Sequence, residues 1–113
     1  MIEILHNPRC SKSRAALSFL KESGRDVKKI LYLENPLSKE AIRDVLKKLN
    51  IPACDLVRKN ESIYIDAFKD KELTDEEWVE VMVKYPKLIE RPVIINGDRA
   101  VIGRPLEKVE EII

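Results

Sequence analysis

A short apolar run that ends in a turn and a cysteine constrains the fold of this chain more than any other feature. The run Ile2–Leu5 predicts a buried strand, and Asn7-Pro8 predicts a turn directly after it. Cys10 follows, and a helical pattern then covers residues 11–23, where Ser23-Gly24 stops it. The cysteine is therefore expected at the junction between a strand and the N-terminus of a helix.

This junction favours negative charge. The free N–H groups and the positive dipole end of a helix N-terminus stabilise an anion, which here is either the thiolate of Cys10 or a bound oxyanion. The cations Arg9, Lys12 and Arg14 lie within four residues, and such surroundings lower the pKa of a thiol. Taken alone, the stretch is explained equally well by a small buried cysteine without a chemical role.

The remaining pattern predicts strands at both ends of the chain and helices between them. A β-like run within Val27–Leu33, around Ile30-Leu31-Tyr32-Leu33, completes a βαβ unit with a parallel strand pair. Residues 38 to about 90 read as entirely helical. Their helices are predicted from the cap Ser38 to Asn50, over Ala53–Val57, around Ile63–Phe68, and from the capping box at Thr74–Glu77 to Pro86.

The last quarter of the chain predicts a β-hairpin and a helix. Val93-Ile94-Ile95 and Ala100-Val101-Ile102 are the strands, and Asn96-Gly97 is the hairpin signal. Pro105 is expected at the first position of the final helix. The order βαβ, helices, ββα predicts an α/β fold, a four-stranded mixed sheet of thioredoxin-like type, in one domain over residues 1–113 with an all-helical insert at about 38–90.

Composition excludes several classes of protein. The chain has 113 residues, enough for one domain, and its 21 Lys and Arg nearly balance 20 Asp and Glu, so no overall charge favours nucleic acid. No apolar run approaches a membrane span and no signal pattern opens the chain, so we expect a cytoplasmic protein that does not bind membranes. The two cysteines and one histidine lack the spacing of a disulfide framework or a metal site.

Four sequence blocks carry a resemblance to a known family. They are His6-Asn7-Pro8-Arg9-Cys10 with Ser13-Arg14, Leu31-Tyr32-Leu33-Glu34-Asn35-Pro36, Leu56-Val57-Arg58-Lys59-Asn60-Glu61, and Ile89-Glu90-Arg91-Pro92-Val93-Ile94 with Gly103-Arg104-Pro105. In this order the chain resembles the ArsC family, the glutaredoxin-coupled arsenate reductases and the small ArsC-like proteins related to them.

The resemblance implies roles for particular residues. Cys10 matches the nucleophile, and Arg58, Arg91 and Arg104 match three arginines that hold the oxyanion and stabilise the thiolate. The supporting positions are His6, beside the active loop, Ser13, close to the thiol, Asn7, which shapes the loop, and Pro92, where a thioredoxin-like fold has a cis-proline. Taken singly, each arginine is better explained as an exposed side chain, whereas the three together in matching blocks favour the site. His6 is explained equally well as a hydrogen-bonded structural histidine.

The implied reaction converts arsenate to arsenite. The thiolate of Cys10 attacks arsenic, glutathione acts as co-substrate, and glutaredoxin clears the remaining link between Cys10 and glutathione. No bound metal or organic cofactor is implied.

Two alternatives use the same fold. One is a glutathione-dependent thiol transferase, which needs Cys10 but not three arginines. The other is an Spx-like regulator that binds RNA polymerase; many of these carry a Cys-x-x-Cys switch, whereas here Ser13 stands three residues after the cysteine. Cys54, in a predicted helix, is expected to be a buried structural thiol.

Overall fold

A computed structural model describes residues 2–113 and divides the chain into two compact units. The sheet unit is made of the residues up to Asn35 together with Arg91–Ile113, and the helical unit is Pro36–Glu90. Among the described residues, no helix is long and apolar enough to cross a lipid bilayer.

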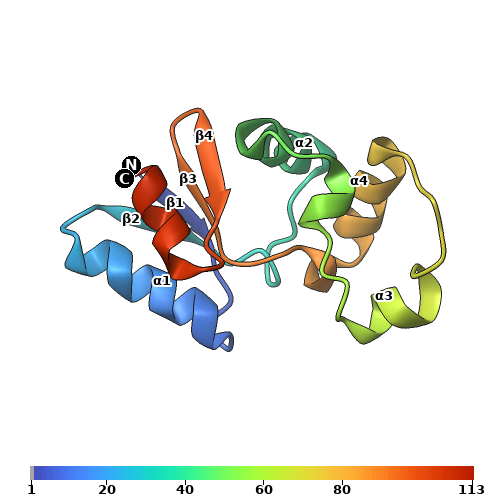
Figure 1. Cartoon of the computed structure of the whole chain (residues 1–113), viewed down its shortest axis with the longest axis horizontal. Coiled ribbons are helices and arrows are strands. Elements are labelled where there is room, and N and C mark those ends of the chain that lie inside the picture. The colour runs from blue at the N-terminus through green and yellow to red at the C-terminus, as the bar shows by residue number, and fades with distance from the viewer. Residues whose placement is uncertain (1) are drawn as a thin grey trace. The chain divides into compact units, whose positions relative to one another are not determined.

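The sheet unit is built on four short strands, as predicted. They are β1 (Ile2–Leu5), β2 (Val27–Ile30), β3 (Val93–Asn96) and β4 (Arg99–Ile102), in the spatial order β2-β1-β3-β4 (Figure 1). The pair β1–β2 is parallel, and the pairs β1–β3 and β3–β4 are antiparallel. This is the mixed sheet of a thioredoxin-like α/β fold.

One face of the sheet carries the core of this unit. Helix α1 (Ser11–Glu22) and the 3₁₀ helix η3 (Leu106–Glu111) pack together over it, the first in blue and the second in red in Figure 1. The buried side chains of this core come from two strands and both helices: Ile2, Ile4, Ala16, Leu20, Ile94, Val109 and Ile112. The core holds the start of α1 against the end of β1, where Cys10 lies.

Strand β2 is shorter than the apolar run that predicts it. It ends at Ile30, and the carbonyl oxygen of Leu31 then accepts hydrogen bonds from the N–H groups of Glu34 and Asn35 at 3.0 and 2.9 Å. This turn replaces the expected extension of the strand to Leu33. The run is apolar because Tyr32, inside the turn, is fully buried, and a buried turn residue gives the same local pattern as a strand.

The C-terminal hairpin forms, but its loop is displaced by one residue. Asn96 pairs with Arg99 as the last residue of β3, so the two-residue loop is Gly97-Asp98, with Gly97 at a φ of 66°. A positive φ favours glycine at this position of a tight hairpin. The side-chain amide of Asn96 instead donates to the carbonyl oxygen of Ile112 at 2.5 Å and fixes the end of the chain.

Proline geometry brings one confirmation and one correction. The Arg91–Pro92 peptide bond is cis, as the fold predicts. The Arg104–Pro105 bond is also cis, and Pro105 precedes the last helix at its N-cap instead of occupying its first position. That last element is a 3₁₀ helix.

The helical unit matches the helical elements predicted for residues 38 to about 90. Its elements are α2 (Lys39–Leu49), η1 (Ala53–Leu56), α3 (Ser62–Ala67), α4 (Asp75–Lys84) and η2 (Pro86–Leu88). Ser38 caps α2, and Thr74 and Glu77 form the predicted capping box at the start of α4. A single β-bridge between Val57 and Ile89 is the one β feature that the helical pattern does not predict.

Candidate active site

Cys10 occupies the N-cap position of α1, directly after the loop that follows β1. Its N–H donates to the carbonyl oxygen of Asn7 at 3.0 Å, and its own carbonyl oxygen accepts from Arg14 N–H at 3.0 Å. The loop is thus closed on itself before the helix begins. The cysteine is half-buried, so its sulfur is held by the protein and still open to a small reactant.

The surroundings of the sulfur favour the thiolate. Partial burial alone raises the pKa of Cys10, but the backbone N–H of Ser13, the Arg91 guanidinium and the backbone N–H of Lys12 stabilise the negative charge, and the net pKa lies below that of an ordinary thiol. Lys12 and Ser13 are the second and third residues of α1, whose N–H groups have no partner within the helix. The side chain of Cys10 accepts no capping hydrogen bond from these N–H groups, so they act on the sulfur as nearby dipoles.

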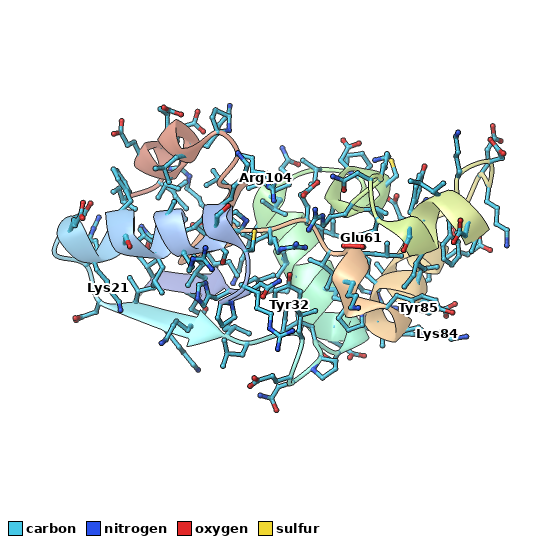
Figure 2. All side chains as sticks on the ribbon, turned by 90° about the horizontal axis from the view of Figure 1, so that it is seen from below. Lys21, Tyr32, Glu61, Lys84, Tyr85 and Arg104 are labelled. Atoms are coloured by element: carbon cyan, nitrogen blue, oxygen red, sulfur yellow. The ribbon has the colours of Figure 1, made fainter. Side chains whose placement is uncertain are left out.

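Two arginines of the sheet unit meet at the cysteine. Nη2 of Arg104 lies 3.9 Å from Sγ of Cys10, and the positive charge of the Arg91 guanidinium helps to lower the pKa of the same thiol. Figure 2 shows Arg104 beside the N-terminal end of α1. Nε of Arg104 also donates to the carbonyl oxygen of Arg91 at 2.5 Å, which ties the two arginine segments together. The structure therefore brings Cys10, Arg91 and Arg104 together.

A close backbone approach positions Arg104. The N–H of Gly103 donates to the carbonyl oxygen of Pro92 at 2.8 Å. A Cβ atom at Gly103 would lie 3.0 Å from Cδ1 of Ile94 and 3.1 Å from Cγ of Pro92, so a side chain does not fit here without displacement of its neighbours. The glycine lets the segment before Arg104 lie against the segment after Arg91.

The supporting residues His6, Asn7 and Ser13 form one hydrogen-bonded network. Oγ of the fully buried Ser13 lies 2.6 Å from Nδ1 of His6 and accepts the N–H of Asn7 at 3.1 Å. Burial first, and then the charges of Lys29, Lys21 and Arg14, lower the pKa of His6, so this imidazole is neutral at pH 7. A neutral His6 that accepts the Ser13 hydroxyl proton at Nδ1 carries its own proton on Nε2. The network shapes the loop, and His6 touches Ser13 instead of the sulfur.

Arg58 lies in the helical unit with a different set of neighbours. Its Nε is 3.7 Å from Oε1 of Glu90, an ion pair too long for a hydrogen bond, and its Nη2 donates to Oδ1 of Asn60 at 3.4 Å. Nε and Nη1 are buried and have no hydrogen-bond partner among residues 2–113. Buried guanidinium N–H groups are costly to leave without a hydrogen bond, and the Glu90 carboxylate offsets only part of that cost.

Two contacts were not predicted from the sequence. The Arg14 guanidinium donates from Nη1 to the carbonyl oxygen of Pro8 at 2.9 Å and braces the loop from the first turn of α1. The acid that pairs with Arg58 is Glu90, the neighbour of Arg91. The sequence shows Pro8 and Glu90, but only the fold determines that they contact Arg14 and Arg58.

Cys54 differs from its expected environment. It lies on η1 in the helical unit and is half-buried instead of buried, with Sγ 3.7 Å from Oδ1 of Asp55. Both cysteines are free thiols, and residues 2–113 contain no cluster of three or more His, Cys, Asp or Glu side chains suited to a metal ion.

Comparison with known proteins places this chain in a family. The chain is 44% identical to the uncharacterized protein YfgD of Escherichia coli K12, over 99% of this chain and 96% of that protein. It is 38% identical to the arsenate reductase of Haemophilus influenzae, over 97% of both chains. The solved structure of the arsenate reductase from Vibrio cholerae superposes with a TM-score of 0.94 at 36% identity and covers 99% of this chain and 97% of that one. A sequence model of the ArsC family matches residues 5–112, and the chain belongs to the ArsC family.

Proposed function

We propose that this protein is an arsenate reductase in which Cys10 is the nucleophile, with glutathione and glutaredoxin as reductants. The observation that carries the proposal is the pair of arginine side chains, Arg91 and Arg104, at a cysteine whose pKa is lowered. Relatives that bear the name arsenate reductase match this chain from end to end, which supports the same substrate.

The arginines suit the charge of the substrate. Arsenate at neutral pH is a tetrahedral oxyanion, and a thiolate that approaches it meets Coulomb repulsion. Guanidinium groups stay charged at this pH and donate in a planar fork to two oxygens, so Arg91 and Arg104 offset that repulsion where the sulfur attacks. Arg58, with two buried N–H groups that have no partner among the described residues, is the third arginine that the proposal assigns to oxyanion binding.

The chemistry proceeds through one cysteine and two molecules of thiol. The thiolate of Cys10 forms a bond to arsenic, and one oxygen of arsenate leaves as water after protonation. The thiolate of glutathione then attacks Sγ, and the sulfur–arsenic electron pair remains on arsenic, which leaves as arsenite. A second thiol, delivered with glutaredoxin, attacks the Cys10–glutathione disulfide and restores the Cys10 thiol. In total, arsenate loses one oxygen and two thiols become one disulfide.

Glutathione and glutaredoxin require a compartment in which thiols stay reduced. The proposal therefore places the protein in the cytoplasm, with arsenate, glutathione and glutaredoxin as its partners.

A coupled assay tests the proposal. Arsenate, glutathione, glutaredoxin, glutathione reductase and NADPH are combined with the wild type or with Cys10→Ser, and each component is omitted in turn. We expect arsenate-dependent NADPH oxidation that requires glutathione and glutaredoxin and is lost in the variant. A folded wild type whose Cys10 alkylates rapidly but which never forms arsenite would contradict the proposal and favour a thiol transferase or a regulator.

A further inference from the structure

A cavity of about 430 Å³ lies beside the cysteine loop in the sheet unit. We call it the loop cavity. Its lining comes from the loop residues His6, Asn7, Pro8 and Arg9 and from the turn after β2. The turn contributes Leu31, Leu33 and Glu34. Its volume lies in the range of small-molecule sites, and its walls combine apolar side chains with a few polar groups, as such sites do.

The two charged side chains of the loop cavity, Arg9 and Glu34, are not paired with another side chain among residues 2–113. His6 also lines the cavity and is almost fully buried, with its Nδ1 held by Ser13. The cavity thus offers a cation and an anion on walls that also carry apolar side chains.

We propose that the loop cavity binds the peptide portion of the reducing thiol, a small zwitterionic thiol that carries both carboxylate and ammonium groups. This inference rests on the proposed function for the need of a thiol co-substrate, and it adds where that thiol binds and which side chains select it. Arg9 receives a carboxylate, and Glu34 receives the ammonium group. Leu31 and Leu33 pack against the backbone and methylene groups of the ligand.

The position of the cavity suits this ligand better than it suits the oxyanion. Arg9 directly precedes Cys10 in the chain, so the loop cavity is lined by the residues that lead up to the nucleophile. The carboxylate of Glu34 would repel arsenate, whereas Arg91 and Arg104 attract it. Oxyanion and thiol therefore reach Cys10 through different sets of side chains.

The test uses thiol–disulfide exchange without arsenate, so that it stands apart from the reductase assay. The thiolate of Cys10 attacks glutathione disulfide, a new disulfide forms between Cys10 and glutathione, and the second glutathione leaves as its thiolate. The rate is measured by mass spectrometry for the wild type, Arg9→Gln and Glu34→Gln. The neutral probe bis(2-hydroxyethyl) disulfide, which lacks carboxylate and ammonium groups, reports the intrinsic reactivity of the thiolate in each variant.

Matched controls remove charges outside the cavity. Lys12→Gln removes an exposed cation two positions after Cys10, and Glu22→Gln removes an exposed acid at the end of α1. We expect Arg9→Gln and Glu34→Gln each to lower the rate with glutathione disulfide, relative to the neutral probe, by up to about fivefold, the usual size of an exposed charge pair. The two control variants are expected to keep the wild-type ratio.

The outcomes separate this proposal from the proposed function. Equal ratios in the wild type, Arg9→Gln and Glu34→Gln would overturn the assignment of the loop cavity even if arsenate is reduced. A ratio that falls in both cavity variants but not in the controls supports the assignment, and it does so even if the coupled assay finds no arsenate turnover. A fall in Lys12→Gln as large as in Arg9→Gln would also overturn it, because it would show a general effect of positive charge.

Discussion

Nη2 of Arg104 lies 3.9 Å from Sγ of Cys10, although 94 positions of the sequence separate the two residues. The contact is possible because β3 pairs with β1 and β4 pairs with β3, so the end of the hairpin returns to the loop after β1. The same segment is tied down by the bond from Arg104 Nε to the carbonyl oxygen of Arg91. The sheet topology therefore places Arg104 next to Cys10.

Arg104→Ala is expected to lower kcat/KM for arsenate by about 10²-fold, the usual loss when one preorganised oxyanion donor is removed. Arg104→Lys keeps the charge but not the planar fork, so it should recover only part of the loss. Steady-state kinetics of both variants provide the measurement. The control is Lys28→Ala, because Lys28 is an exposed cation on β2. Equal activity of all three variants would contradict the assignment of Arg104 to the site.

The pH dependence of Cys10 follows from its lowered pKa. Alkylation rate and thiolate absorbance should rise with a midpoint below the value of about 8.5 for a free cysteine. Between the pKa of Cys10 in the folded state and that in the unfolded chain, the folded state holds fewer protons. The contribution of Cys10 to the free energy of unfolding is therefore fully present above the unfolded pKa. It is lost as the pH falls through the folded pKa.

Comparison with Cys10→Ser isolates this contribution. The stability of the wild type relative to Cys10→Ser should decrease as pH is lowered through the midpoint found by alkylation. A constant difference across that range, or an alkylation midpoint near 8.5, would mean that the helix N-terminus and Arg91 do not stabilise the thiolate.

Gly103→Ala should destabilise the sheet unit by about 1–3 kcal/mol, because the added Cβ would lie 3.0 Å from Cδ1 of Ile94. Ile94→Val removes that Cδ1 atom, so the cost of Gly103→Ala should be smaller in the Ile94→Val background. A double-mutant cycle of urea unfolding measures the coupling. Fully additive effects would show that the close approach does not constrain the segment before Arg104.

Ser13→Ala removes the acceptor of Asn7 N–H and the partner of His6 Nδ1 inside the protein. Leaving buried polar groups unpaired costs about 1–3 kcal/mol, so chemical denaturation should show a loss of this size. Ser11→Ala, at the exposed first position of α1, is the control and should change stability much less. Equal stability of the two variants would mean that the network does not support the loop.

Cys54→Ser should leave arsenate turnover unchanged, because the proposed mechanism uses only Cys10 and glutathione. Cys54 lies in the helical unit with Asp55 as its nearest polar partner. The coupled assay measures this directly. Loss of turnover with the fold preserved would indicate a second essential thiol.

Local patterns predicted most of the elements because those patterns have local causes. Cap residues such as Ser38 and Thr74, and the strand run at Val93, act within a few residues of themselves. The end of β2 was placed too late because the buried Tyr32 imitates a strand residue from inside a turn. Helical spacing likewise does not distinguish an α-helix from the 3₁₀ helix that the last element forms after Pro105.

The candidate site was less accessible to local reasoning. The thiolate-favouring place of Cys10 follows from the strand, turn and helix pattern, but the arginines came from the family resemblance. The approach of Arg91 and Arg104 to Cys10 depends on strand pairing over long sequence separations, which no local pattern encodes. The hydrogen bond from Arg14 to the carbonyl oxygen of Pro8 and the loop cavity near Glu34 likewise form only in the folded chain.

A single-turnover experiment tests the central claim most directly. Arsenate and one equivalent of glutathione are mixed with the Cys54→Ser protein in the absence of glutaredoxin, and arsenite and protein mass are followed together. We predict that each arsenite released is matched by one glutathione disulfide-bonded to Cys10. Arsenite formed without that adduct, or the adduct formed at the same rate without arsenate, would contradict the single-cysteine mechanism.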